Sequence, residues 1–312
     1  MAEWIKPKRL QPGDRIGIVS PSYWMPEENL RSAVNYLESI GFNLVLGDSN
    51  QLRNNIYAGT PQQRADDLMS MFADPSIDAI FCARGGYGGN RVLPLLDYDV
   101  IRSNPKIFMG FSDITGYLSS IAQQSKLVCF HGPMLANFVK NQHAYNERTM
   151  WNVLSGEDNI EVTDDPKCQA KTLKTGRATG ELWGGNLSLL NERLGTHDQI
   201  DTNDKILLIE EVGEKFYAFD RMLLHIKRSG SLDSVKGIIF GEMTEMGDTK
   251  IPFGKDTDDI ILDVCSELDI PIISNFPCGH GDLMATLPIG HQVELVADET
   301  NSKILIPESP VT

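Results

Sequence analysis

The first half of the chain alternates short, continuously apolar runs with longer segments whose apolar residues recur every three or four positions. Continuous apolar runs are typical of strands buried on both faces, and the periodic segments are typical of helices that cover such a sheet. Strands are predicted at residues 15–20, 42–47, 78–85, 106–111 and 127–133, and helices at residues 26–41, 60–72, 113–124 and 143–156. This alternation predicts a parallel, doubly wound α/β sheet.

The pattern changes after about residue 150. A polar stretch rich in Thr and Lys, residues 159–182, is the expected crossing to a second domain. Beyond it the sequence predicts strands at residues 204–211, 237–243 and 271–276, helices at residues 216–230 and 257–269, and a hairpin over residues 291–307. We therefore expect two domains, residues 1–160 and residues 161–312, the second with strands and helices mixed.

Composition and charge narrow the classes of partner. The 312 residues are 41% apolar, which is enough for a core, and the formal net charge of −15 argues against nucleic acid and anionic membranes as partners. Neither a signal peptide nor a membrane span is predicted, because no apolar run reaches 18 residues. The 5 cysteines form no C-x-x-C pair, which predicts a reducing compartment and no disulfide framework.

The turn after residues 106–111 carries the first candidate for chemistry. Ligands of doubly wound sheets bind beyond the carboxyl ends of the strands. Ser112 lies between an apolar run and a helical pattern, as in the strand–serine–helix turn of serine hydrolases. The helix N-terminus would offer backbone N–H groups to an oxyanion. The alternative is that Ser112 caps the helix, with Asp113 at its first position, and Ile114 departs from the motif G-x-S-x-G.

A glycine-rich run, residues 85–89, follows another predicted strand. It is not a dinucleotide fingerprint, because Arg91 stands where the third glycine belongs, and it is not a P-loop, because no Gly-Lys-Ser/Thr follows. It is either a flexible turn or a second source of backbone N–H groups for an anion. In the second case Arg84 or Tyr87 would lie near the substrate.

A nucleophilic serine needs a base, and the chain has 6 histidines. His280 lies on a loop at the exit of the strand predicted at residues 271–276, and His131, which follows the apolar run LVCF, is its rival. The alternative for a loop histidine is plain exposure to solvent. No H-E-x-x-H motif and no tight His/Asp cluster predicts a metal site.

Two adjacent carboxylates could orient such a base. Glu210 and Glu211 end the apolar strand predicted at residues 204–211, where an unpaired carboxylate would cost free energy of desolvation. A solvated strand end, or a structural ion pair with Arg221, is the alternative.

Six segments taken together resemble one family. The segments ARGGYGGNRVL, GFSDIT, HGPM, GELWGGNLSLL, ILLIEEVGEKFYAFDRML and GHGDLMATLPIG occur in this order in LD-carboxypeptidases, and the resemblance covers roughly residues 12–307. It implies a Ser–His–Glu triad outside the common hydrolase folds, so that Ile114 is no obstacle. The implied nucleophile, carboxylate and base are Ser112, Glu210 and His280, and the implied oxyanion donors are the amides of Asp113 and Gly86.

The same resemblance implies a fold and a substrate. The N-terminal domain would be flavodoxin-like and carry the nucleophile, and a smaller, strand-rich C-terminal domain would carry the other two triad members, with the active site between them. The expected activity is release of the terminal D-alanine from muramyl tetrapeptides in peptidoglycan recycling, in the cytoplasm, by a homodimer without metal or cofactor. Arg84 is our candidate for the residue that holds the terminal carboxylate, and the alternative is that Arg84 forms a salt bridge between the domains.

Two other functions compete with this one. Microcin C immunity proteins belong to the same family and cleave peptidyl adenylates, for which they need an adenine pocket, usually with an aromatic residue from a C-terminal loop. Residues 244–256, TEMGDTKIPFGKD, are short and lack Trp and Tyr, which favours the wall peptide. A non-catalytic protein that binds a small ligand at helix N-termini is the third reading, and Ser112 and His280 need not meet in it.

Overall fold

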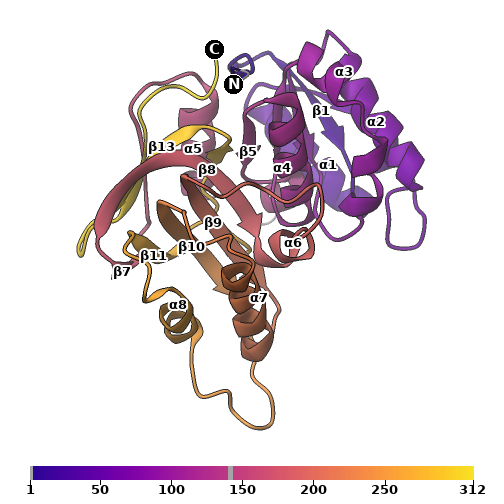
Figure 1. The fold of residues 1–312 in the computed structure, drawn as a ribbon. Coiled ribbons are helices and arrows are strands. Elements are labelled where there is room, and N and C mark those ends of the chain that lie inside the picture. The colour runs from indigo at the N-terminus through magenta and orange to yellow at the C-terminus, as the bar shows by residue number, and fades with distance from the viewer. Residues whose placement is uncertain (1–2, 140–142) are drawn as a thin grey trace. The chain divides into compact units, whose positions relative to one another are not determined.

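The structure is a computed structural model that describes residues 3–139 and 143–312. The chain folds into two compact units. The first consists of residues 1–157, 285–290 and 309–312, and the second of residues 158–284 and 291–308. The first unit is built mainly from the indigo-to-magenta part of the ribbon in Figure 1 and the second mainly from the pink-to-yellow part.

The first unit is built on a six-stranded sheet in the order β12-β5-β4-β3-β1-β2. Its strands are β1 (Arg15–Val19), β2 (Asn43–Leu46), β3 (Ala79–Cys82), β4 (Ile107–Gly110), β5 (Cys129–His131) and β12 (Leu287–Ile289). The first five are parallel in the order 2-1-3-4-5, the flavodoxin-like order, and β12 adds an antiparallel edge beside β5. The predicted parallel, doubly wound sheet is confirmed.

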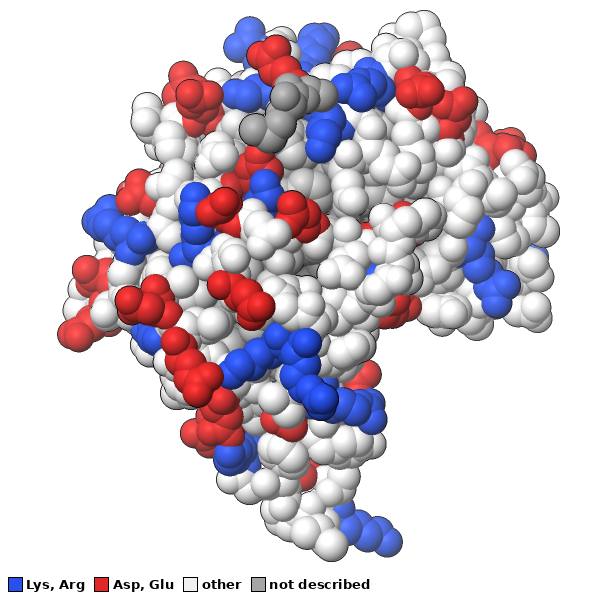
Figure 2. Space-filling model, viewed as in Figure 1, with Lys and Arg blue, Asp and Glu red and all other residues white. Residues whose placement is uncertain are grey.

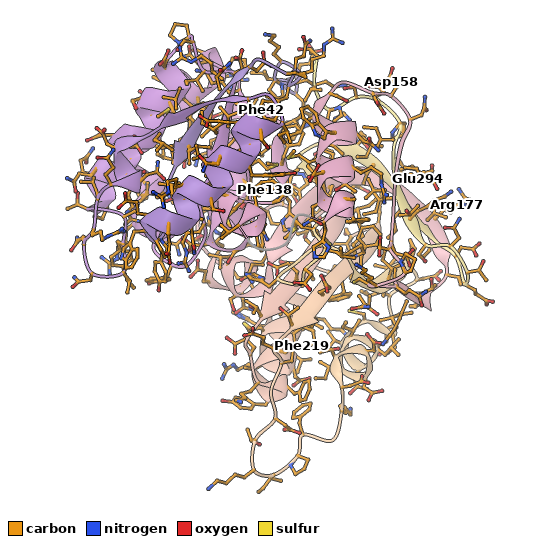
Figure 3. All side chains as sticks on the ribbon, turned by 180° about the vertical axis from the view of Figure 1, so that it is seen from behind. Phe42, Phe138, Asp158, Arg177, Phe219 and Glu294 are labelled. Atoms are coloured by element: carbon orange, nitrogen blue, oxygen red, sulfur yellow. The ribbon has the colours of Figure 1, made fainter. Side chains whose placement is uncertain are left out.

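Helices and short 3₁₀ turns connect these strands. The helices are α1 (Glu27–Ser39), α2 (Pro61–Ala73), α3 (Tyr98–Ser103), α4 (Thr115–Ser125) and α5 (Ala144–Leu154), and the 3₁₀ turns are η1 (Asp48–Asn50), η2 (Gly89–Arg91), η3 (Leu93–Leu95), η4 (Ser112–Ile114) and η5 (Leu135–Phe138). Thr60 and Gln63 form the predicted capping box of α2. Aromatic stacking joins the helical layer: Phe42 stacks on Trp151 at 5.1 Å between ring centres, and Phe138 stacks on Tyr36 at 5.7 Å (Figure 3).

The second unit is built on an eight-stranded sheet in the order β6-β14-β13-β8-β9-β10-β11-β7. Its strands are β6 (Ile160–Thr163), β7 (Lys171–Lys174), β8 (Gly176–Asn186), β9 (Lys205–Val212), β10 (Gly237–Thr244), β11 (Ile272–Phe276), β13 (Gln292–Ala297) and β14 (Lys303–Ile306). Strands β8 to β11 are parallel to one another, and the predicted hairpin is confirmed as the antiparallel pair β13–β14. The polar stretch 159–182, predicted as the crossing to the second domain, contains the strands β6 and β7 and the first part of β8.

Three helices belong to the second unit: α6 (Leu187–Glu192), α7 (Phe216–Arg228) and α8 (Thr257–Cys265). Helix α7 buries an apolar stripe that includes Phe219 (Figure 3). Asp256 and Asp259 form a capping box at the start of α8. Carboxylates and cations are interspersed on the face seen in Figure 2. Over the described residues, no helix has both the length and the apolar character needed to cross a bilayer.

Candidate active site

Ser112 lies at a strained turn at the carboxyl end of β4. The backbone is extended at Phe111 and then enters the left-handed region at Ser112, where φ is 63°. A positive φ at a residue with a side chain costs conformational energy and is typical of functional turns. The cap residue of α4 is Ile114, and it makes no side-chain cap hydrogen bond, so Ser112 is not the N-cap of this helix. The turn therefore has the strand–serine–helix geometry of a nucleophile elbow.

The carboxylate of Asp113 ties this turn to the glycine-rich run. Its side chain is buried, and Oδ2 accepts a hydrogen bond from the backbone N–H of Gly89 at 3.0 Å and another from the hydroxyl of Ser22. A buried carboxylate that accepts two hydrogen bonds fixes the positions of both donors. The serine turn, the glycine-rich run and the exit of β1 are thus held as one assembly.

The glycine-rich run lies against Ser112 and Tyr23. A Cβ at Gly85 would lie 2.9 Å from Cβ and 3.0 Å from Oγ of Ser112, so the run touches the serine directly. At Gly86, φ is +126° and a Cβ would overlap the ring of Tyr23. Both positions require glycine, one because the backbone approaches the serine and the other because of its conformation.

The sequence analysis missed the segment after β1 that supports this assembly. The carbonyl of Pro21 accepts hydrogen bonds from Arg64 at 2.7 Å and from the hydroxyl of Tyr117 at 2.8 Å. Arg64, on α2, is only 1% exposed and also donates to the carbonyl of Gly88 at 3.3 Å. Burial lowers the pKa of Arg64, although Tyr117 and Asp113 oppose the shift. The available signal was the position of Pro21 at the exit of β1, the edge where parallel sheets bind ligands.

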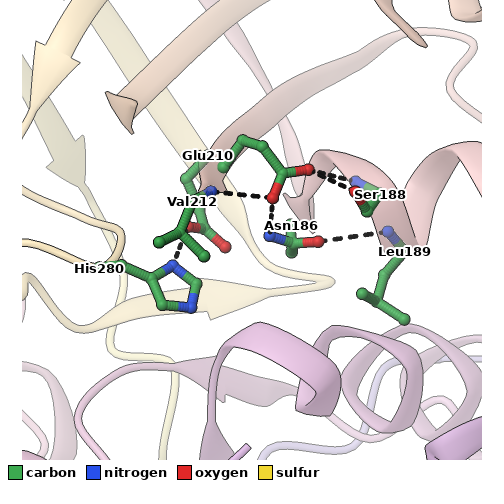
Figure 4. A network of polar contacts seen from close by, with 7 residues as sticks. Asn186, Ser188, Leu189, Glu210, Val212 and His280 are labelled. Carbon is green, nitrogen blue, oxygen red and sulfur yellow. Dashed lines mark hydrogen bonds and ion pairs between the residues drawn. The ribbon is translucent and has the colours of Figure 1, made fainter. Parts of the chain in front are cut away.

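The second unit brings Glu210 and His280 together. Glu210, near the end of β9, is fully buried, and its Oε2 lies 2.7 Å from Nδ1 of His280, which follows β11 (Figure 4). Burial lowers the pKa of His280, but the hydrogen bond and charge of Glu210, with Glu211 and Glu245 adding to them, outweigh it and raise the pKa overall. The carboxylate therefore holds Nδ1 and stabilises the protonated ring.

Glu211 makes different contacts from Glu210. Its two carboxylate oxygens accept four hydrogen bonds: from the side chain of Asn186 at 3.0 Å, from N and Oγ of Ser188 at 2.8 and 2.6 Å, and from N of Val212 at 2.8 Å (Figure 4). These bonds join β9 to the start of α6. Across residues 3–139 and 143–312, neither carboxylate forms an ion pair with Arg221, whose guanidinium lies 5.9 Å from the ring centre of Tyr217 instead.

A third carboxylate near His280 was not expected from the sequence. Glu242, on β10, is half-buried, and a Cβ added at Gly281 would overlap its carboxylate. Burial raises the pKa of Glu242, with Asp282 and Glu210 adding to the shift and Cys168 and His280 opposing it. The glycine that follows His280 is therefore required by the carboxylate packed against it.

The arrangement of the potential metal ligands and the position of His131 bear on two further predictions. In the part of the chain that the structure describes, no group of three or more His, Cys, Asp or Glu side chains is arranged to hold a metal ion, and all 5 cysteines are free and buried. His131 ends β5, is fully buried and packs edge-on against Phe111, with ring centres 6.0 Å apart.

Comparison with known proteins places both units in one family. Residues 16–132 match the LD-carboxypeptidase N-terminal domain and residues 179–295 match the LD-carboxypeptidase C-terminal domain. The "Probable murein peptide carboxypeptidase" of Bacillus subtilis is 33% identical over 300 residues, covering 96% of this chain and 94% of that protein.

Solved structures agree with this result. The muramoyltetrapeptide carboxypeptidase from Oxalobacter formigenes has a TM-score of 0.85 at 27% identity, over 95% of this chain and 100% of that one. Wild-type microcin C7 self-immunity protein MccF has a TM-score of 0.89 at 26% identity, over 99% and 100%. These likenesses confirm the predicted enzyme class, a carboxypeptidase, over a non-catalytic binding protein. The chain belongs to the LD-carboxypeptidase family.

Proposed function

We propose that the protein is a serine-type LD-carboxypeptidase that releases the terminal D-alanine of muramyl tetrapeptides in peptidoglycan recycling. The nucleophile is Ser112, the general base is His280, and Glu210 orients the base. The observation that carries the proposal is the 2.7 Å contact between buried Glu210 and Nδ1 of His280, because it leaves Nε2 as the nitrogen that exchanges protons with a serine. The strained turn at Ser112 supports the choice of nucleophile.

The first half of the proposed reaction forms an acyl-enzyme. His280 takes the hydroxyl proton of Ser112 while the oxygen attacks the scissile carbonyl. The carbonyl electrons move onto oxygen, and the amides of Asp113 and Gly86 stabilise this oxyanion, each by about 3 kcal/mol. The intermediate collapses, the C–N bond breaks, and His280 gives its proton to the leaving amine of D-alanine.

The second half reverses these roles with water. His280 takes a proton from water, the hydroxide attacks the ester carbonyl, and the same two amides stabilise the second oxyanion. When the C–O bond to Ser112 breaks, the imidazolium returns its proton to the serine oxygen. Glu210 stays ionised throughout and stabilises the positive charge on the ring.

The direct test is release of D-alanine from a tetrapeptide that ends in diaminopimelyl-D-alanine, followed by mass spectrometry. We expect the wild-type protein to release D-alanine and to leave the L-centred acyl part intact. A folded protein that releases nothing from this peptide, or from its lysine counterpart, would contradict the proposed substrate.

A second candidate reaction is favoured by the close likeness to MccF, which has been solved in complex with aspartyl sulfamoyl adenosine at a TM-score of 0.89 to this chain. The same triad would cleave the aspartyl amide of such a compound. Liquid chromatography of sulfamoyl adenosine release, run beside the D-alanine assay, decides between the two leaving groups.

We predict that Glu210 sets the pH at which activity is lost on the acid side of the pH profile. His280 must be neutral to act as a base, and its raised pKa places the acid limb of kcat/KM above the ordinary histidine value of 6.5. Activity is therefore lost as pH falls through this raised pKa. In Glu210→Gln the limb should move to lower pH, because the charge that raised the pKa is gone, while kcat falls by about 10²–10⁴.

Profiles of kcat/KM between pH 5 and pH 9, measured for both proteins, check this prediction. Glu211→Gln is not a neutral control, because Glu211 holds α6 in place. His225→Gln is suitable, since His225 is an exposed residue of α7. An acid limb that does not move in Glu210→Gln would mean that another group titrates.

We further propose a homodimer in the cytoplasm, as is usual in the family. Five free, buried cysteines are compatible with a reducing compartment. Light scattering should give twice the chain mass of 34.7 kDa, and cell fractionation should place the protein in the cytoplasmic fraction. A single-chain mass would contradict the dimer without affecting the proposed reaction.

A further inference from the structure

Arg84 and Tyr23 flank the proposed oxyanion donor Gly86. The guanidinium carbon of Arg84 lies 5.6 Å from the ring centre of Tyr23. The same ring lies against Gly86, where a Cβ would overlap it, and the backbone N–H of Tyr23 donates to the carbonyl of Gly85 at 3.4 Å. One tyrosine thus contacts both a cation and the backbone segment that touches Ser112.

The guanidinium of Arg84 has no anionic partner. Within the described residues it forms no ion pair and no hydrogen bond, and it lies over the ring of Tyr23. The guanidinium of Arg64, by contrast, donates to two carbonyls. Arg84 is half-buried, so its positive charge is partly desolvated. None of the 43 acidic residues of the chain pairs with it in the described structure. Such a group is prepared to receive an anion from outside the chain.

We propose that Arg84, held on the ring of Tyr23, binds the terminal carboxylate of the leaving D-amino acid. This inference rests on the proposed function. It assigns to the guanidinium of Arg84 the restriction of cleavage to the C-terminal residue of the peptide. The terminal carboxylate lies within about one residue length, ~3.8 Å, of the scissile bond. Arg84 is adjacent in the chain to Gly85, which contacts Ser112, so its place in the chain fits this carboxylate better than one farther along the peptide.

Tyr23 is a positioning residue in this arrangement. Its ring face attracts the guanidinium and limits the directions that the side chain of Arg84 can take. Tyr57 and Tyr87 continue the aromatic row, with ring centres 6.1 Å from Tyr23 to Tyr57 and 6.4 Å from Tyr57 to Tyr87. Tyr87 is 50% exposed and stays a candidate for contact with the rest of the peptide.

The test compares two peptides that differ in one group: the tetrapeptide ending in D-alanine and the same peptide ending in D-alaninamide. We expect the wild-type protein to favour the acid by at least about 100-fold in kcat/KM, because a site built to bind a charged group discriminates strongly against an analogue that lacks it. Arg84→Gln should reduce this ratio to below about 10-fold by slowing cleavage of the acid, and should leave cleavage of the amide nearly unchanged.

Arg53→Gln is the matched control. Its guanidinium also lies over an aromatic ring of the first unit, 4.0 Å from the ring centre of Trp24, and within the described residues it forms no hydrogen bond or ion pair with residues 85–89. This variant should keep the acid-to-amide ratio of the wild type. Tyr23→Phe should keep the ratio as well, because the ring face remains, whereas Tyr23→Leu should lower it. A change that only loosened the fold would slow both peptides equally and leave the ratio unchanged.

A binding measurement separates this proposal from the proposed reaction. Calorimetry with Ser112→Ala, which cannot turn over, should show tighter binding of the acid than of the amide, and the added Arg84→Gln change should make the two affinities equal. Equal affinities in Ser112→Ala itself, or an unchanged ratio in Arg84→Gln, would overturn the role of Arg84. Failure of the wild type to release D-alanine, with tighter binding of the acid retained, would contradict the proposed reaction and leave the carboxylate site in place.

Discussion

Replacing Ser112 by alanine should lower the rate of D-alanine release by about 10⁴–10⁶, to a level near the assay background. The reason is that the acyl-enzyme cannot form without the serine oxygen, and only oxyanion stabilisation and binding remain. The substitution removes one oxygen from a half-buried side chain and should not unfold the protein. Because KM reports mainly binding here, the loss should appear in kcat.

Labelling with a fluorophosphonate gives an independent measurement of the same residue. The wild-type protein should take up one label per chain, and Ser112→Ala should take up none. Ser70→Ala is a matched control, since Ser70 is an exposed serine of α2 in the same unit. Turnover by Ser112→Ala at more than about a hundredth of the wild-type rate would show that another nucleophile, or directly activated water, does the chemistry.

Gly86→Ala should also lower the rate of D-alanine release strongly. The new methyl group would overlap the Tyr23 ring and would also hold a side chain at φ +126°, which favours glycine. The backbone must shift, so the Gly86 amide leaves its place as an oxyanion donor, and kcat should fall by about 10²–10³. Steady-state kinetics with the tetrapeptide measures this loss.

Gly13→Ala separates backbone strain from loss of the donor. Gly13 also has a positive φ, +94°, in the same unit, but a Cβ there meets no atom within 4 Å. Both variants should lose thermal stability, by about 1 kcal/mol from the strained conformation, while only Gly86→Ala should lose activity. Equal activities in the two variants would argue against Gly86 as a donor.

Much of the fold could be predicted because most of its strands are recognisable from the apolar pattern of their own residues. Strands β3 and β4 are buried along their whole length and are therefore continuously apolar in the sequence. The return of residues 285–290 and 309–312 to the first unit could not be predicted. Strand β12 has three residues and pairs with β5, so nothing in its own sequence reveals its neighbour.

Some residues of the candidate site could be predicted from the sequence and others could not. Glu210 and His280 were identified from motifs, and their contact is present in the structure. Ser22 was missed, because its hydrogen bond to Asp113 spans 91 positions and nothing near Ser22 in the sequence indicates a buried partner. Contacts between distant segments are recognisable from sequence only when a family pattern already links the two segments.

Strand β12 also imposes an order of events during synthesis. Strand β5 ends at residue 131 and β12 begins at residue 287, so the ribosome makes roughly 150 further residues before the sixth strand exists. At about 5–20 residues per second, this takes on the order of ten to thirty seconds. Throughout that interval β5 is an open sheet edge able to pair with a neighbouring nascent chain. Slow translation or crowded polysomes should therefore increase aggregation of this protein even when the finished fold is stable.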